Sequence, residues 1–421
     1  MWQFVDATDA FGFYRPATQL SIYLDLAVHG PEPARLRALN VALHAGAIAM
    51  AFVVARLVTG SSLAAGLTTL AFALTPKAHP TAVLWISARA EILMSLFVFA
   101  AIASWIVWTR NGRAWWLAGA VAAYLLALTS KETATLLPLL LLLTPRSERS
   151  LAHRAAAVAG LLVIAAAVYA MRSHVGALTP FSGDSHYDLM TGIARWTRNA
   201  SNYAMRMFVA PASLLLAIGL GRAGQRFFST SAATDRPKPL LVSYLVDVRL
   251  IAFAAAFVVV FLAPVLPIAL RSELYLYLPV FGVCLLAGWL GALLVRRMPV
   301  RSQAIALAFF VVALGGYQAA RSLEIHRDLV FSDRLVAALR SRSDLTTDNR
   351  AVALVPSDAT TERFFRGAIG GYLYLVLRHV FPGASLTGAV LYPGDSPHQG
   401  DLRLLTTYRP DQGIVVILRE R

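Results

Sequence analysis

The sequence predicts an all-α polytopic membrane protein with about ten transmembrane helices and a small α/β domain at its C-terminal end. Of the 421 residues, 57% are hydrophobic and 14% are charged, whereas a soluble domain has about 45–50% and about 25%. Long apolar runs recur between residues 38 and 320 and exceed the length of a buried strand. These observations exclude a soluble globular protein and a disordered chain.

The charge balance points to a membrane rather than to a nucleic acid. The chain has 38 Lys and Arg against 23 Asp and Glu, for a formal net charge of +15. The basic residues stand in pairs and triplets between apolar runs, so nucleic acid is not an expected partner. The single cysteine, Cys284, excludes an intrachain disulfide. Residues 1–35 are polar and aromatic, and no cleavable signal peptide is expected there.

Residues 38–320 are expected to form the transmembrane domain, after an N-terminal segment, 1–37, at the outer face. A span needs about 20 apolar residues to cross the hydrocarbon. The ten predicted spans lie at 38–58, 62–76, 90–108, 114–130, 133–145, 155–172, 201–220, 249–269, 274–295 and 302–320. The shortest of them are expected to tilt little, to thin the bilayer or to stop short of its far side.

The basic residues predict the topology. Between Arg56 and Arg301, fourteen Lys and Arg residues fall on one side of the membrane, seven fall on the other, and Arg206 lies within a span. By the positive-inside rule, the side with fourteen is cytoplasmic. Ten spans then leave both termini outside, as in a multi-pass protein of a bacterial inner membrane with an extracytoplasmic C-terminus.

Two outer segments are large enough to carry structure. In the loop 173–200, apolar residues from Tyr187 to Trp196 share one face of a possible helix, which is typical of a helix in the membrane interface; a polar loop is the alternative. The tail, 321–421, is predicted to be a small extracytoplasmic α/β domain. Its expected elements are strands at 351–356 and 413–418 and a helix at 367–380.

Isolated polar and ionisable residues gather at the outer ends of the predicted spans. Charge at a membrane edge is costly and usually functional, whereas the opposite side carries only short Arg-rich loops. The outer-end residues are Tyr14, Arg15, Asn40, His44, Lys77, His79, Arg89, Glu91, Lys131, Glu132, Arg271 and Glu273. No cluster has the spacing of metal ligands, and no nucleotide-binding or hydrolase motif is present, so neither a metal nor another cofactor is expected.

Structural roles are open for several of these residues. The pair Lys131–Glu132 can form a solvated turn, and Arg271 can pair with Glu273 at the interface. Asn40 and His44 lie one turn apart and can serve as packing contacts between helices.

Cationic side chains at one membrane face are suited to hold an anionic head group. Arg binds phosphate through a planar fork, and Lys binds it as a point charge. A lipid-linked phosphate sugar has its phosphate at this depth. A nearby carboxylate can take the proton of an acceptor hydroxyl, and the basic residues can stabilise the leaving lipid phosphate. The pattern therefore favours an inverting glycosyl transfer without a nucleotide sugar.

Five stretches carry a resemblance to a known family. They are Phe13-Tyr14-Arg15-Pro16, Asn40-Val-Ala-Leu-His44, the segment from Leu74 to Leu93 with His79, Arg89 and Glu91, Ser130-Lys131-Glu132, and Glu273-Leu-Tyr-Leu-Tyr-Leu-Pro279. In this order they resemble the GT-C superfamily of polyprenyl-phosphate-sugar-dependent glycosyltransferases. Within it, they are most similar to the transmembrane-and-tetratricopeptide-repeat O-mannosyltransferases and their bacterial relatives.

The resemblance implies a GT-C-like fold and an inverting, metal-independent transfer from a polyprenyl-phosphate-linked sugar donor to a protein or glycan acceptor at the extracytoplasmic face. Membrane lipids are the other expected partner. The residues that the resemblance places around the donor phosphate and sugar are Arg15, His79, Arg89, Lys131 and Glu132. The predicted substrate-binding set is completed by Tyr14, His44, Lys77, Glu91, Arg271 and Glu273.

Three departures from the family pattern keep alternatives open. The family begins with a further helix and an acidic motif that supplies the catalytic carboxylate; here Asp6 and Asp9 are the only carboxylates before Tyr14, and they are the predicted catalytic residues. Leu274 stands where the family has Arg, and the tail replaces the repeats. The alternatives are a transporter or flippase for a lipid-linked sugar and a truncated, inactive glycosyltransferase homologue.

Overall fold

The computed structural model describes most of the chain. The described residues are 13–30, 32–177, 189, 192–228, 248–269, 271–296, 298–342, 352–368, 388–391, 402–412 and 414–419. The chain divides into two compact units, Met1–Ala319 and Ala320–Arg421. The predicted substrate-binding residues all belong to the first unit.

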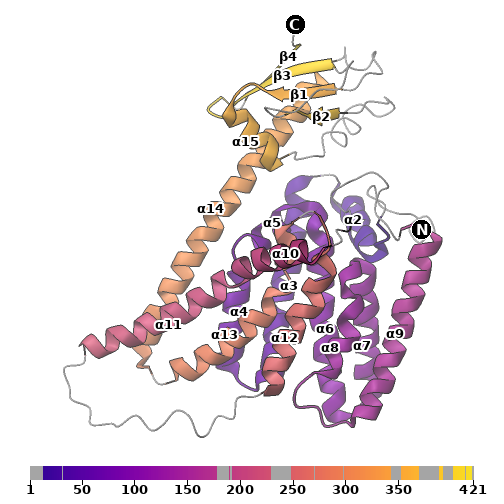
Figure 1. The fold of residues 1–421 in the computed structure, drawn as a ribbon, viewed down its shortest axis with the longest axis vertical. Helices are drawn as coiled ribbons and strands as arrows, with labels where there is room; N and C mark the ends of the chain where they lie inside the picture. The colour runs from indigo at the N-terminus through magenta and orange to yellow at the C-terminus, as the bar shows by residue number, and fades with distance from the viewer. Residues whose placement is uncertain are drawn as a thin grey trace. The chain divides into compact units, whose positions relative to one another are not determined.

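The described part of the first unit is almost entirely helical (Figure 1). Its α-helices are α2 (Pro16–His29), α3 (Pro33–Thr59), α4 (Ser62–Ala73), α5 (Ala78–Leu84), α6 (Arg89–Asn111), α7 (Ala114–Ser130), α8 (Leu137–Leu142), α9 (Leu151–His174), α10 (Ile193–Met207), α11 (Val209–Phe228), α12 (Val248–Leu262), α13 (Val280–Val295) and the beginning of α14 (Val300–Arg340). Short 3₁₀ segments join some of them: η1 (Ile86–Ala88), η2 (Glu132–Leu136), η4 (Ala263–Val265) and η5 (Glu273–Leu276).

Six helical segments in the described chain are long and apolar enough to cross a membrane, so the expected count of ten is not confirmed. These segments are 33–59, 86–111, 151–174, 193–224, 248–265 and 300–340. The other predicted spans correspond to shorter apolar helices, at 62–73, 114–130, 132–142 and 280–295. Even 17 residues extend only about 26 Å, less than the ~30 Å of hydrocarbon. The 3₁₀ segments η2 and η5 shorten two of these helices further.

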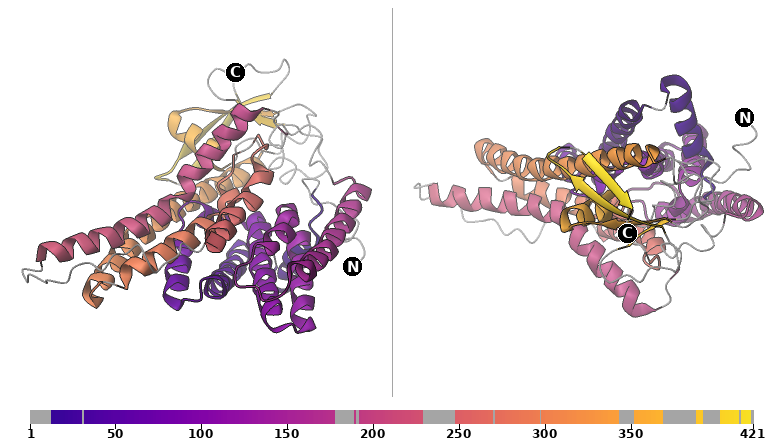
Figure 2. Two further views of the ribbon diagram at one scale, coloured as in Figure 1. Left: turned by 60° about the horizontal axis from the view of Figure 1, so that its bottom comes forward. Right: turned by 90° about the horizontal axis from the view of Figure 1, so that it is seen from above.

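Helix α6 forms the centre of the first unit. Its side chains are largely buried, including Ile92, Phe99 and Trp105, and α3 and α7 pack against it. Figures 1 and 2 show α9 at the edge of the same bundle. On another side of the core, α13 packs closely against α4 at Gly288. A Cβ atom at this position would lie 2.7 Å from the Cα of Thr68, so only glycine permits this approach.

Arginines cap the C-terminal ends of helices at one end of the bundle. Their guanidinium groups donate to main-chain carbonyls at 2.7–3.0 Å. The pairs are Arg110–Leu57, Arg146–Thr59, Arg149–Gly112 and Arg154–Leu142. These carbonyls belong to groups that a helix end leaves unsatisfied. All four arginines lie on the side predicted to be cytoplasmic; the orientation itself stays a prediction.

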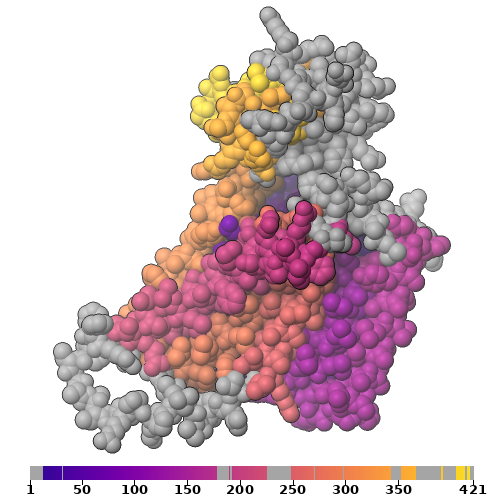
Figure 3. Space-filling view, in the orientation of Figure 1, coloured from indigo at the N-terminus to yellow at the C-terminus, as the bar shows by residue number. Residues whose placement is uncertain are grey.

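Helix α10 contains residues 193–196 of the predicted interface helix, whereas Leu189 pairs with Ile268 in an isolated antiparallel bridge. Ile193 and Trp196 are exposed on it, whereas Tyr203 is buried. Figure 3 shows α10 and α11 on the surface of the first unit. Tyr187 and Met190, which belong to the predicted apolar face, lie outside the described residues.

The second unit contains a four-stranded sheet with the strand order β2-β1-β3-β4. Strand β1 (Val352–Pro356) is parallel to β2 (Gly388–Val390) and to β3 (Leu402–Arg409). Strand β3 is antiparallel to β4 (Ile414–Arg419). The strands β1 and β4 begin within one residue of the two predicted strands.

The small core of the second unit joins helices to this sheet. Phe331, from the C-terminal part of α14, and Phe365, from α15 (Ala359–Ala368), pack against Leu354 and Leu404 of the central strands. The predicted helix at 367–380 is described only at its first two residues, which are the last two of α15.

Candidate functional site

The 3₁₀ turn η5 brings several predicted site residues together. The Ser272 hydroxyl caps this turn by accepting a hydrogen bond from the Leu274 main-chain N–H at 3.3 Å. Three sets of contacts extend from the turn: Glu273 with Lys77 and Arg206, Tyr275 with Lys131, and Tyr277 with His44. Residues far apart in the sequence therefore meet around one short segment.

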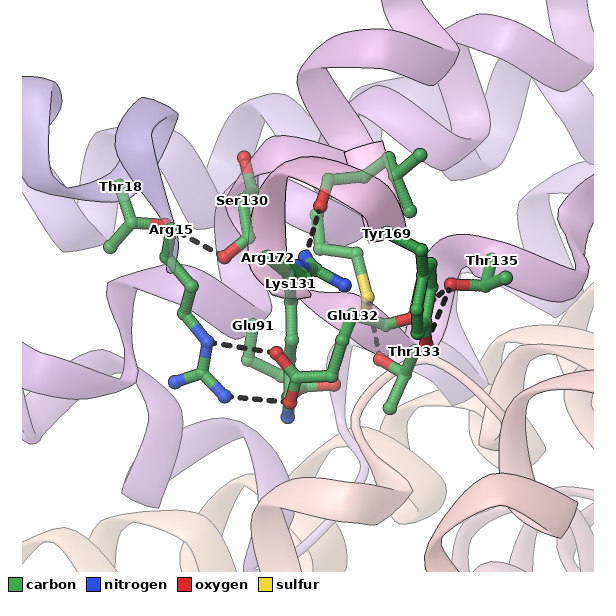
Figure 4. A network of polar contacts seen from close by, with 12 residues as sticks. Arg15, Thr18, Glu91, Ser130, Lys131, Glu132, Thr133, Thr135, Tyr169 and Arg172 are labelled. Carbon is green, nitrogen blue, oxygen red and sulfur yellow. Dashed lines mark hydrogen bonds and ion pairs between the residues drawn. The ribbon is translucent and has the colours of Figure 1, made fainter. Parts of the chain in front are cut away.

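Arg15 and Glu132 form a two-pronged ion pair (Figure 4). Arg15 Nε donates to Glu132 Oε2 at 3.0 Å, and Nη2 donates to Oε1 at 2.7 Å. The Thr18 hydroxyl donates to the Ser130 carbonyl at 3.0 Å and holds α2 against the end of α7. Burial raises the pKa of Glu132, but the charge of Arg15 and its hydrogen bonds lower it more, to about 2. Glu132 is therefore ionised and a weak proton acceptor at neutral pH.

Lys131 and Glu91 form a buried ion pair. Glu91 lies in the first turn of α6, and Lys131 follows the last residue of α7 in an extended conformation. The Lys131 ammonium also lies 5.1 Å from the centre of the Tyr275 ring, within the range of a cation–π contact. Removing two ions from water often costs more free energy than their pairing gains. The pair therefore suggests a role besides stability.

Arg172, in the last turn of α9, is one of the seven basic residues predicted on the outer side of the membrane, and it is not among the predicted site residues. The residue is 3% exposed. Its Nη2 donates to the Leu128 carbonyl at 2.8 Å, while its buried Nη1 has no hydrogen-bond partner among the residues that the structure describes. Its charge contributes to the low pKa of Glu132, and Figure 4 shows it in the same network. An arginine at the outer end of an apolar helix is the sequence signal that could have identified it.

Glu273 is shared by two cations. Its Oε1 lies 3.6 Å from Lys77 Nζ and 3.5 Å from Arg206 Nη1. Lys77 directly precedes α5, and Arg206 comes from the end of α10. The sequence predicts Arg206 to lie within a span, and Arg206 is not among the predicted site residues.

Histidine and aromatic rings surround Tyr277. His44 Nδ1 lies 2.6 Å from the Tyr277 hydroxyl. The His79 ring centre lies 4.5 Å from that of Tyr277 and 5.0 Å from that of His44. Burial lowers the pKa of His79 well below its ordinary value, so its ring is neutral at pH 7. These two histidines are therefore suited to position Tyr277.

Arg89 lies in a closed network with no exposed side-chain surface. Its hydrogen bonds run from Nε to Asn40 Oδ1 (2.8 Å), from Nη2 to Asp25 Oδ2 (2.7 Å) and to the Leu36 carbonyl (2.9 Å), and from Nη1 to the Ser21 carbonyl (3.3 Å). Burial raises the pKa of Asp25, but hydrogen bonds from Arg89 and His29 lower it below its ordinary value. These contacts give Arg89 a structural role, in which it joins α2 and α3 to the start of α6.

The remaining predicted site residues lie around these groups or outside the described chain. Tyr14 is buried directly before Arg15, and Arg271 is exposed two residues before Glu273. Asp6 and Asp9 lie outside the described residues. Within the described ranges, no group of three or more His, Cys, Asp or Glu side chains is placed to hold a metal ion.

The charges around η5 divide into two groups. The Lys131 group comprises Arg15, Glu91, Lys131, Glu132 and Arg172, with three cations and two carboxylates. The Lys77 group comprises Lys77, Arg206 and Glu273, with two cations and one carboxylate. Each described group has a surplus of one positive charge, which is suited to an anionic ligand.

No protein-family model matches the chain, and no curated protein matches it.

Proposed function

We propose that the protein is a membrane glycosyltransferase that moves a sugar from a polyprenyl-phosphate donor to an acceptor hydroxyl at the extracytoplasmic face. The Lys131 group is the observation that carries the proposal. A lipid-linked phosphodiester holds a single negative charge at the edge of the hydrocarbon, and the described residues of this group are three cations and two carboxylates. The resemblance of the motifs around Arg15, Glu91 and Lys131 to the GT-C superfamily supports the same activity.

In the proposed reaction, the acceptor oxygen attacks the anomeric carbon on the side opposite the phosphate. The bond from that carbon to the phosphate oxygen breaks, the configuration inverts, and polyprenyl phosphate leaves with one more negative charge. Lys131 and Arg172, which are both buried, stabilise this charge because a low-dielectric site strengthens their attraction. Arg15 offers the phosphate the planar donors that now bind Glu132.

The reaction also needs a carboxylate to accept the proton of the acceptor hydroxyl. Glu132 is poorly suited because its pKa is about 2, and Glu91 is engaged by Lys131. We therefore assign the general-base role to Asp6 or Asp9, which shortly precede Arg15 in the sequence.

The proposed orientation places the Lys131 group outside the cell, at the outer face of a bacterial inner membrane. Glu91 lies in the first turn of α6 and Arg110 in its last turn, so the Lys131 group and the capping arginines belong to opposite ends of one long helix. The positive-inside rule assigns the arginine end to the cytoplasm. The acceptor is then an exported protein or glycan, and the second unit is extracytoplasmic.

The test is sugar transfer by the purified full chain in lipid, with a radiolabelled polyprenyl-phosphate sugar and bacterial envelope extract as the acceptor source. Arg15→Gln is expected to reduce the transfer rate about 10²–10³-fold, the usual effect of losing one group that stabilises transition-state charge. Because Lys131→Met alone leaves Glu91 unpaired, Lys131→Met/Glu91→Gln provides the second variant. Arg113→Ala, at an exposed residue directly before α7, removes the same charge and is the control.

Two results contradict the proposal. One is a transfer rate equal to that of the wild type in both Arg15→Gln and the double variant. The other is movement of the labelled lipid across the bilayer by the wild type with no transferred sugar, which identifies a flippase instead.

A further inference from the structure

The Lys77 group is not used by the reaction described above, although it lies beside the Lys131 group. Its two cation–carboxylate distances are 3.6 and 3.5 Å, longer than the roughly 2.7–2.9 Å of a charge-assisted hydrogen bond. Arg15, by contrast, approaches Glu132 to 2.7 Å. These two long contacts with Glu273 therefore satisfy only a few of the N–H donors that Lys77 and Arg206 carry.

The Lys77 group is also open to a ligand. The side chains of Lys77 and Arg206 are 41% and 35% exposed, whereas that of Lys131 is 9% exposed. The described chain therefore leaves part of the Lys77 and Arg206 side chains uncovered.

The backbone of Lys77 is held in a rarely populated conformation. Its φ is 68° and its ψ is −59°, and the Ala78 N–H donates to the Pro76 carbonyl at 2.8 Å. This is the γ-turn with positive φ, which is rare and strained. A residue with a Cβ atom keeps such a conformation only where the surroundings impose it, and such residues cluster at functional sites.

The Lys77 and Lys131 groups are joined by η5. Glu273 and Tyr275, which contact the two groups, lie two residues apart in this turn. A 3₁₀ helix rises about 2 Å per residue, so their backbones are separated by about 4 Å along its axis. The two groups therefore contact the same short turn, an arrangement suited to hold a donor and a small acceptor side by side.

We propose that the Lys77 group is a second anion site, which binds a carboxylate or phosphate of the acceptor. The inference rests on the proposed glycosyltransferase function, because only that function supplies an acceptor. Lys77 and Arg206 hold the anion, and Glu273 keeps their side chains together when the anion is absent. The γ-turn presents the Lys77 ammonium at a cost in folding stability.

The first experiment tests the γ-turn by comparing the thermal unfolding of Lys77→Gly and Lys77→Ala in detergent. Both substitutions remove the ammonium, and only glycine accepts positive φ without strain. Lys77→Gly is therefore expected to unfold at the higher temperature, the reverse of the usual effect of replacing alanine by glycine. An equal or lower unfolding temperature for Lys77→Gly overturns the claim that this turn is strained.

The second experiment measures how inorganic phosphate raises the unfolding temperature at constant ionic strength. Lys77→Gly and Arg206→Gln are each expected to weaken the apparent phosphate affinity of the second site about tenfold, because each removes a charged hydrogen-bond donor. Arg113→Ala is expected to keep the wild-type response. If Lys77→Gly and Arg206→Gln keep it too, the second anion site is overturned.

Titration with polyprenyl phosphate separates the acceptor anion from the donor phosphate. The affinity of Lys77→Gly for this lipid is expected to stay within about twofold of the wild type, whereas Arg15→Gln loses it. A parallel tenfold loss in Lys77→Gly assigns the site to the donor and overturns the acceptor assignment. Neither binding measurement requires sugar transfer, so failure of the proposed glycosyltransferase function is detected separately.

Discussion

Replacing Arg89 by methionine tests whether this residue supports the fold or binds the donor. Methionine keeps an unbranched, flexible side chain about as long as the arginine stem, but it removes the guanidinium group and all four of its hydrogen bonds. Its most consequential lost partner is Asp25, which is 4% exposed and lies 2.7 Å from Arg89 Nη2. The variant therefore leaves a buried carboxylate without its main counter-ion.

The loss of unfolding free energy in Arg89→Met depends on whether Asp25 stays ionised without its counter-ion or becomes protonated. Breaking a buried ion pair by removing one partner costs about 3–5 kcal/mol. The cost is limited because Asp25 can bind a proton instead. At pH 7, roughly three pH units above its ordinary pKa, protonating a carboxylate costs about 1.4 kcal/mol for each unit, or about 4 kcal/mol in total. We therefore expect Arg89→Met to lose about 4 kcal/mol of unfolding free energy at pH 7.

The loss also has a defined pH dependence. In the wild type, the lowered pKa of Asp25 contributes stability that is present above the ordinary pKa near 4 and is lost as the pH falls through the lowered value. In Arg89→Met, the carboxyl is protonated at almost no cost near pH 4. The difference between the two proteins is therefore expected to be large at pH 7 and to shrink as the pH approaches 4.

The assay is denaturant unfolding in detergent at pH 7 and pH 4.5, followed by tryptophan fluorescence. Arg89→Met/Asp25→Asn serves as the matched double variant and is expected to recover most of the loss at pH 7. The reasoning is refuted if Arg89→Met loses less than about 1 kcal/mol at pH 7 while its affinity for polyprenyl phosphate collapses, because Arg89 then contacts the donor.

Three further predictions follow from the packing and the caps. Lys131→Met is expected to lower the free energy of unfolding by about 3–5 kcal/mol, because it leaves Glu91 buried and unpaired. In the same assay, Lys131→Met/Glu91→Gln is expected to recover most of this loss. Equal losses in the two variants contradict the buried pair. Gly288→Ala is expected to lower stability by about 1–3 kcal/mol, because its Cβ meets the backbone of Thr68; an unchanged unfolding temperature argues against the close packing of α4 and α13. Asp358 accepts a hydrogen bond from the third main-chain N–H of α15 at 2.7 Å, so Asp358→Ala is expected to cost the second unit about 1 kcal/mol. Hydrogen bonding lowers the pKa of Asp358, so hydrogen exchange in α15 should show this contribution above about pH 4 and its loss below.

The sequence predicts the features that depend on local patterns. Apolar runs identify the helical segments, and two short apolar runs typical of buried strands identify β1 and β4 within one residue of their observed starts. The isolated charges of Lys131, Glu132 and Glu273 mark the part of the fold where the chain segments converge. Each of these signals is contained within a short window of residues.

The features that the sequence does not predict depend on tertiary contacts. The 3₁₀ segments η2 and η5 shorten two of the helices, but they cannot be recognised in the sequence because each leads directly into the apolar run of the helix that follows. Arg89 has its partner Asp25 on a different helix, 64 residues away, so its structural role is invisible in its own motif. In the sequence, Arg172 resembles an ordinary helix-end arginine and Arg206 lies within a predicted span; only the structure places them near Glu132 and Glu273.

Binding of polyprenyl phosphate to the purified full chain tests the central claim most directly. Native mass spectrometry in lipid-mimicking detergent should detect one lipid phosphate per protein, with an affinity at least about tenfold weaker in Arg15→Gln and unchanged in Arg113→Ala. The absence of a bound lipid phosphate in the wild type, or equal binding by wild type and Arg15→Gln, would contradict the account.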